Sequence, residues 1–256
     1  YPDSLTAGRE LAQALNHKDL THVLIFSVGL KVNGSELVNG LREVLPTQVT
    51  MTGGLAGDQA RFCETLVISN AGVSNDSVLA VGLYGPRIKV ASASLGGWDS
   101  FGPERIITKS AGNVLHQLDH KNALDIYKSY LGDYTKDLPG SALLFPLALK
   151  TTGSTEDLVR TVLAVDHDAH TMTFAGDVPE GSRCQFMKAN FDRLVDGAIS
   201  AAERSQTVTP NRQPEFALLI SCVGRKLVLR QRIEEEVEGV RRVFGDQTVL
   251  AGFYSY

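Results

Sequence analysis

The chain has 256 residues, of which 43% are hydrophobic and 21% charged, and its formal net charge at pH 7 is −4. This composition excludes a disordered chain and is typical of a globular protein with one large domain or two ordinary ones. The sequence has no basic block, so we expect no nucleic-acid partner. It also has no apolar run near the ~20 residues of a membrane-spanning helix, so we expect no membrane partner.

The cysteines indicate a reducing compartment. Cys63, Cys184 and Cys222 are odd in number and far apart in the sequence, which argues against a disulfide framework. We therefore expect a cytoplasmic protein. The first residue is Tyr1 rather than Met, so we interpret the chain as a fragment.

The first part of the chain predicts the order helix, strand, helix, strand. An N-terminal helix precedes THVLIFSVG at residues 21–29, an apolar run of the length of a strand buried on both faces. A second helix follows the turn at Asn33–Gly34, is capped by Ser35 and ends at Pro46. The next strand, QVTMTGG, is expected to end at its glycine pair.

Residues 65–95 predict an antiparallel meander, because short turns separate the strand-like runs TLVISN, SVLAVGLYG and IKVASASL. A transitional stretch, residues 96–139, comes next. It contains a helix at Asn122–Leu131 that stops at Gly132.

The second half predicts three strands, a helix, a strand, a helix and a last strand. In order, these are DLVRTVLAVD, HTMTFAGD, SRCQFMKA, FDRLVDGAISAAER, FALLISCVG, residues 230–244 and QTVLAGFYSY. The turn DHDAH lies between two alternating runs, so we expect a solvent-facing hairpin turn there rather than a metal site.

Two segments of the chain look like copies of each other. THVLIFSVG aligns with FALLISCVG, and GLREVLPTQVTMTGG aligns with GVRRVFGDQTVLAGF. The matched pairs include Leu24 with Leu219, Gly29 with Gly224, Gly40 with Gly239, Arg42 with Arg241 and Gly53 with Gly252. We predict an internal duplication in an α/β fold with mixed sheets and α+β meanders, whose two halves are related by a pseudo-twofold axis. Each copy is a strand–helix–strand unit with parallel strands.

The ends of the copied strands are the first candidate for a binding site. Open α/β sheets place ligands at the carboxyl ends of their strands. Gly53–Gly54 and Gly252–Phe253–Tyr254 close equivalent strands, so we expect them to face a shared cleft between the halves. The alternative is that Phe253 and Tyr254 fill the core.

The order of several motifs resembles the FIST domain over essentially the whole chain. GGLAGD and Arg61–Phe62 resemble its N-terminal portion, which we assign to residues 1–120. Pro146, SCVGR and GFY resemble its C-terminal portion, which we assign to residues 121–256. In the family, the last motif continues into Gly-Glu.

The resemblance implies a cytoplasmic sensor of small ligands, with amino acids proposed. Its partner would be an output such as a histidine kinase, a cyclic-di-GMP enzyme or a methyl-accepting receptor. A similar subset of the family consists of haem-containing nitric oxide sensors. The candidate ligand-binding residues are Gly53, Gly54, Asp58, Arg160, Cys222, Arg225, Gly252, Phe253 and Tyr254.

Two of these residues carry specific chemistry. A nearby guanidinium would favour the thiolate of Cys222, which could then react or bind a metal; the alternative is a small buried hydrophobic residue. The planar fork of Arg225 suits a carboxylate or a haem propionate. The alternative for Arg225 is a salt bridge to a neighbouring glutamate.

The sequence favours a non-catalytic sensor, because no Walker A, G-x-G-x-x-G or G-x-S-x-G motif is present. Three alternatives stay open: a haem-based nitric oxide sensor, an enzyme that uses Cys222, and a bare scaffold for a partner kinase. For haem b, His116 is the candidate axial ligand. No Cys-x-x-Cys-His sequence is present, so such a haem would be non-covalent.

Overall fold

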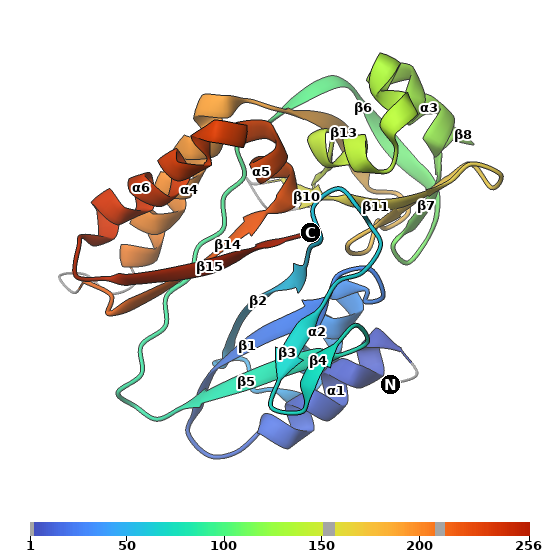
Figure 1. Cartoon of the computed structure of the whole chain (residues 1–256). Helices are drawn as coiled ribbons and strands as arrows, with labels where there is room; N and C mark the ends of the chain where they lie inside the picture. The colour runs from blue at the N-terminus through green and yellow to red at the C-terminus, as the bar shows by residue number, and fades with distance from the viewer. Residues whose placement is uncertain (1–2, 151–156, 208–212) are drawn as a thin grey trace.

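The computed structural model describes residues 3–150, 157–207 and 213–256. Within these residues the fold is mixed α/β, as predicted (Figure 1). The strands form a five-stranded mixed sheet, an eight-stranded antiparallel sheet and a two-stranded hairpin. None of the described helices is both long and apolar enough to cross a membrane.

The first strand–helix–strand unit has the predicted order. It consists of α1 (Ser4–Leu15), β1 (Leu20–Val28), α2 (Gly34–Val44) and β2 (Thr50–Ala56). β1 and β2 are parallel, as the crossover rule requires. The cap of α2 is Asn33 rather than the expected Ser35, because the helix begins at Gly34 and the Asn33 side chain accepts from the amides of Ser35 and Glu36.

The predicted strand ends at the glycines are wrong. β2 continues through Gly53 and Gly54 to Ala56, and β15 (Val249–Ser255) continues through Gly252. A Cβ at Gly53 would clash with the carbonyl oxygen of Ile25, and one at Gly252 would clash with that of Leu219. These two glycines therefore allow a close approach to the neighbouring parallel strand rather than a turn.

The predicted meander is only partly right. β3 (Val67–Ser69) and β4 (Gly72–Ser74) form the separate hairpin, and β5 (Val78–Tyr84) pairs antiparallel with β1. Residues 88–95 form no strand and connect the two large sheets. Their alternating pattern resembles a strand, but they have no partner strand to satisfy their backbone groups.

The eight-stranded sheet contains β6, the longest described strand, whose residues were predicted only as part of a transitional stretch. Its members are β6 (Trp98–Ala111), β7 (Val114–Leu118), β8 (Lys121–Asn122), β9 (Leu147–Lys150), β10 (Leu158–Arg160), β11 (Val162–Asp166), β12 (Thr171–Phe174) and β13 (Arg183–Ala189). The predicted helix appears as α3 (Ala123–Leu131), which ends at Gly132 as expected. Two 3-10 helices follow, η1 (Gly132–Asp137) and η2 (Gly140–Leu144).

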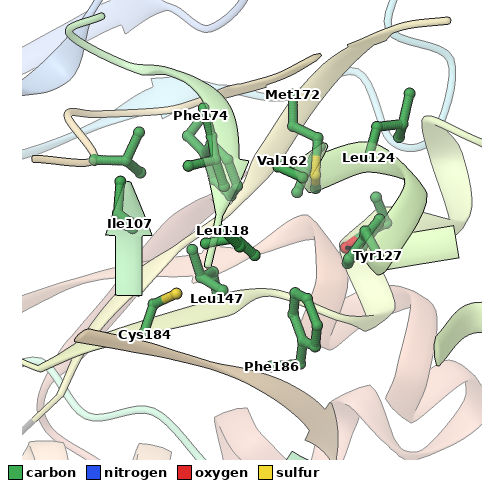
Figure 2. Packing of buried hydrophobic residues seen from close by; sticks show 14 of the residues in the cluster. Ile107, Leu118, Leu124, Tyr127, Leu147, Val162, Met172, Phe174, Cys184 and Phe186 are labelled. Atoms are coloured by element: carbon green, nitrogen blue, oxygen red, sulfur yellow. Dashed lines mark hydrogen bonds between the residues drawn. The ribbon is translucent and has the colours of Figure 1, made fainter. Parts of the chain in front are cut away.

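The largest hydrophobic core lies between this sheet and α3. Figure 2 shows side chains from the sheet, among them Phe174, Met172 and Phe186, gathered around Tyr127 and Leu124 of α3. Each fully buried side chain of this size contributes about 1.5–3 kcal/mol relative to an exposed one. The Tyr127 hydroxyl stays satisfied by donating to the carbonyl of Phe145 at 2.8 Å.

The second strand–helix–strand unit comes after the eight-stranded sheet in the chain. It consists of α4 (Phe191–Gln206), β14 (Phe216–Cys222), α5 (Val223–Leu229), the 3-10 helix η3 (Arg230–Arg232), α6 (Ile233–Phe244) and β15. β14 and β15 are parallel, as predicted. The expected helix at residues 230–244 begins later, at Ile233, because η3 occupies its first turn.

The two predicted portions are interleaved in space. The boundary between residues 120 and 121 lies between β7 and β8, two paired strands of one sheet. The five-stranded sheet takes β1, β2 and β5 from the first portion and β14 and β15 from the second. A boundary in the sequence is therefore no boundary between two separate cores.

Candidate ligand-binding site

The two strand–helix–strand units meet end to end. β15 runs antiparallel to β2, with Ser255 opposite Ala56, and the amide of Tyr256 donates to the carbonyl of Leu55 at 3.0 Å. Because β1 is parallel to β2 and β14 to β15, the carboxyl ends of all four strands converge (Figure 1). We call residues 55–58 and 253–256 the strand-end junction.

Asp58 ties the two sides of the strand-end junction together. Its buried carboxylate accepts from the backbone amides of Phe62, Cys63 and Glu64 at 2.9–3.0 Å and from the Tyr256 hydroxyl. Burial alone would raise the pKa of Asp58, but the hydrogen bonds from Tyr256 and the three amides outweigh it and lower the pKa. Asp58 is therefore ionised, and its carboxylate binds both the loop that follows it and Tyr256.

The aromatic residues of β15 pack into the junction. The Phe253 ring lies 5.7 Å from that of Phe26, and a Cβ at Gly54 would lie 3.4 Å from the Phe253 ring. The Tyr256 ring stacks on Phe62 at 4.9 Å. Leu143, Leu163 and Val223 are buried in the same cluster, with Leu30, Leu55, Ala175, Leu227 and Tyr254 around them. The strand ends face each other as expected, but apolar side chains fill the space between them.

Arg225 is occupied by protein oxygens. Its Nε lies 2.6 Å from Oε1 of Glu236, and its terminal nitrogens donate to the carbonyls of Gly96 and Leu194. The Arg225 and Glu236 side chains are only 8% and 7% exposed. This geometry favours the salt-bridge alternative for Arg225 over direct contact with a ligand.

Cys222 ends β14 and caps α5. Its sulfur accepts from the amide of Gly224 at 3.2 Å. Burial raises the pKa of the thiol, and the amides of Gly224 and Arg225 and the guanidinium oppose it only in part. The expected thiolate is therefore disfavoured, because desolvation outweighs the nearby charge. An enzyme that uses Cys222 gains no support.

Arg160 lies at a contact between the first unit and the eight-stranded sheet, away from the strand-end junction. Its Nε donates to the carbonyl of Asp177 at 2.8 Å, and its Nη2 donates to the hydroxyl of Ser35 at 3.3 Å. Asn33 donates to the Asp177 carboxylate at 2.7 Å. Burial lowers the pKa of Arg160, and Asp177 opposes that effect. Arg160 thus connects the start of α2 to the eight-stranded sheet.

The residues around His116 do not fit a haem site. His116 is half-buried in β7, within the eight-stranded sheet, whereas Cys222 and Arg225 belong to the five-stranded side of the fold. The cleft lined by Lys226 and Leu227 of α5 has no histidine, cysteine or methionine in its lining. No group of three histidine, cysteine or acidic residues in the described ranges could hold a metal ion. Haem binding is not supported.

A cleft of about 400 Å³ lies between η2, α5 and α6, and the sequence analysis missed it. It is lined by Gly140, Leu144, Lys226, Leu227, Arg230 and Ile233. It adjoins the strand-end junction, because the Lys226 ammonium lies 4.7 Å from the Tyr254 ring. The available signal was the pair of basic residues Lys226 and Arg230, which closely follow the candidates Cys222 and Arg225 in the sequence.

A buried histidine also escaped the sequence analysis. His22 is fully buried in β1, and its two ring nitrogens lie 2.6 Å and 2.9 Å from the hydroxyls of Thr50 and Thr52. Burial lowers its pKa. The alternation of Thr50 and Thr52 on one face of a neighbouring strand was the signal for a polar partner.

Comparison with known proteins finds the same two portions. Residues 2–121 match the FIST N domain and residues 123–256 match the FIST C domain. An uncharacterised protein of Methanocaldococcus jannaschii, MJ1623, is 22% identical over 223 residues, which are 79% of this chain and 41% of that protein. The chain therefore spans less than half the length of this relative. No solved structure matches.

Proposed function

Because the chain belongs to the FIST family, whose domains are sensory modules of signalling proteins, we propose that it is a non-catalytic sensor of a small ligand. The ligand binds between the two halves, at or beside the strand-end junction. The signal passes to a separate output, such as a histidine kinase or a cyclic-di-GMP enzyme. The convergence of four strand ends is the observation that carries this proposal.

The proposed site keeps the candidates of the sequence analysis, but in two roles. Gly54, Phe253 and Tyr254 lie where the strand ends meet; Phe253 and Tyr254 are half-buried, and the Tyr254 ring faces Lys226 of the cleft. Gly53 and Gly252 act indirectly, because they let the parallel strands approach closely. The remaining candidates support the site through internal contacts: Asp58, Arg160, Cys222 and Arg225.

A change in the relative position of the two units supplies the mechanism. Polar contacts hold the first unit and the loop after it against the rest of the fold, among them Asp58 with Tyr256 and Ser35 with Arg160. A ligand can shift such an arrangement only by binding one position more tightly than the other. A ligand bound beside Tyr254 would lie two residues along the chain from Tyr256 and would therefore act directly on the contact between Asp58 and Tyr256.

We infer that the two units arose by duplication. Arg42 donates to the carbonyl of Val49 at 2.7 Å, and its sequence match Arg241 donates to the carbonyl of Thr248. The same side chain thus ties the end of the helix to the start of the next strand in both units. This supports the pseudo-twofold relation, in which two equivalent sets of strand ends face each other.

A thermal-shift screen of small carboxylates and amino acids tests the sensory function, followed by hydrogen exchange with any compound that binds. We expect at least one compound to raise the melting temperature, because it binds the native state alone. Its binding should change exchange at residues 57–64 and 253–256, and Tyr256→Phe should weaken that change. A melting temperature that no compound moves would favour the bare scaffold instead.

A further inference from the structure

We propose that the cleft between η2, α5 and α6 is the ligand site, and that it takes a small apolar carboxylate without an ammonium group. This inference rests on the proposed sensory function, names the class of ligand, and places the site within the second portion, beside the junction with the first. It is carried by the charges of the cleft, by the backbone of one lining residue, and by the position of the cleft beside the strand-end junction.

The cleft presents two cations that have no anionic partner. Lys226 and Arg230 stand four residues apart, and in the described part of the chain neither side chain forms an ion pair. Other arginines of the same segment are paired, Arg225 with Glu236 and Arg232 with Glu235. The lining of the cleft contains no acidic residue. An anion therefore finds two partners there, whereas an ammonium group finds none.

The backbone of Arg230 supports a role for its side chain. Arg230 ends α5 with φ 50° and ψ −109°, a conformation that strongly favours glycine. Gly132 ends α3 with nearly the same angles, φ 57° and ψ −124°. A non-glycine residue held in such a conformation is strained, and strain of this kind concentrates at ligand sites. Arginine in a conformation that favours glycine is compatible with a role for the guanidinium, beside its unpaired charge and its place in the cleft lining.

The rest of the cleft suits an apolar body. Leu144, Leu227 and Ile233 line it, and its volume of about 400 Å³ falls within the range of small-molecule sites. A carboxylate between Lys226 and Arg230 would draw the ammonium away from the Tyr254 ring, which it now faces at 4.7 Å. Binding in the cleft would therefore reach the strand-end junction through β15.

Three matched probes test the proposed ligand class by calorimetric titration. 3-Phenylpropanoate has the carboxylate and the apolar body, phenylalanine adds an ammonium group, and 3-phenylpropanamide lacks the charge. We expect 3-phenylpropanoate to bind. The affinity of each of the other two probes should be lower by a factor of about ten or more. Absence of heat with 3-phenylpropanoate at about 10 mM, or equal binding of the three probes, overturns the proposal.

Two variants and a control locate the binding. Lys226→Met and Arg230→Gly should each weaken 3-phenylpropanoate about tenfold, since each removes one charge-assisted contact. Arg230→Gly should not lower the melting temperature, because glycine suits that backbone. Arg232→Gln removes one positive charge outside the cleft and should leave binding unchanged.

The two proposals fail in different ways. If both cleft variants bind 3-phenylpropanoate as tightly as the parent chain, the cleft assignment is wrong while the sensory function stands. If the parent chain binds no compound in the thermal-shift screen, the sensory function is lost as well.

Discussion

Arg225 and Glu236 form an ion pair whose side chains are less than one-tenth exposed. We predict that Arg225→Met lowers the free energy of unfolding by about 3–5 kcal/mol, because it leaves the Glu236 carboxylate buried without a partner. Urea unfolding measures this change. Arg232→Met, which breaks exposed ion pairs with Glu235 and Asp192, should cost less than about 1 kcal/mol. An Arg225→Met variant of unchanged stability that loses ligand binding would restore Arg225 as a ligand contact.

His22 makes the stability of the first unit depend on pH. Burial holds the pKa of His22 below its ordinary value. As the pH falls, His22 is therefore protonated in the unfolded chain while it is still neutral in the folded chain. The free energy of unfolding should therefore fall as the pH drops below about 6.5, with a slope of up to ~1.4 kcal/mol per pH unit. His22→Gln, which can still hydrogen-bond Thr50 and Thr52, should lack this part of the slope. Identical slopes for the two proteins would contradict the prediction.

Helix pairs α1–α2 and α4–α6 are packed through matched glycines with different surroundings. A Cβ at Gly40 would clash with the carbonyl of Leu5, whereas one at Gly239 would lie 2.6 Å from the Ile199 side chain. We predict that Gly40→Ala destabilises by about 1–3 kcal/mol despite the higher helix propensity of alanine. Gly239→Ala should cost much less, because the Ile199 side chain can move. Urea midpoints of the two variants test this, and equal midpoints would refute it.

At the scale of the whole molecule, the interleaving of the two portions restricts how the units can move. Both large sheets take strands from both portions, so the first unit cannot separate from the second without loss of β2–β15 contacts. The proposed function needs only small shifts of this unit, because Asp58–Tyr256 at the strand-end junction and Arg160–Ser35 at the start of α2 are polar contacts that can rearrange. We therefore expect the proposed sensor to report through a small rearrangement rather than through the separation of two domains.

Local and short-range features of the fold followed from the sequence alone. The two strand–helix–strand units, their parallel strands and the stop of α3 at Gly132 were predicted correctly. Helix periodicity, capping residues and the handedness of a crossover act within about thirty residues, and a single sequence carries all three. Phe253 and Tyr254 belong to the predicted last strand, and their place in a ligand site stays a prediction.

The tertiary structure decided the roles that depend on distant partners. Gly53 was predicted to end a strand, and only the fold shows the carbonyl of Ile25 beside it. Arg225 was left between a ligand and a neighbouring glutamate, and only the fold places Glu236 against it. The cleft needs η2, which lies 82 to 86 residues before Lys226 in the chain, to close one side of it. A sequence reports which groups are available, but desolvation and pairing decide their chemistry, and both depend on contacts that only the folded chain makes.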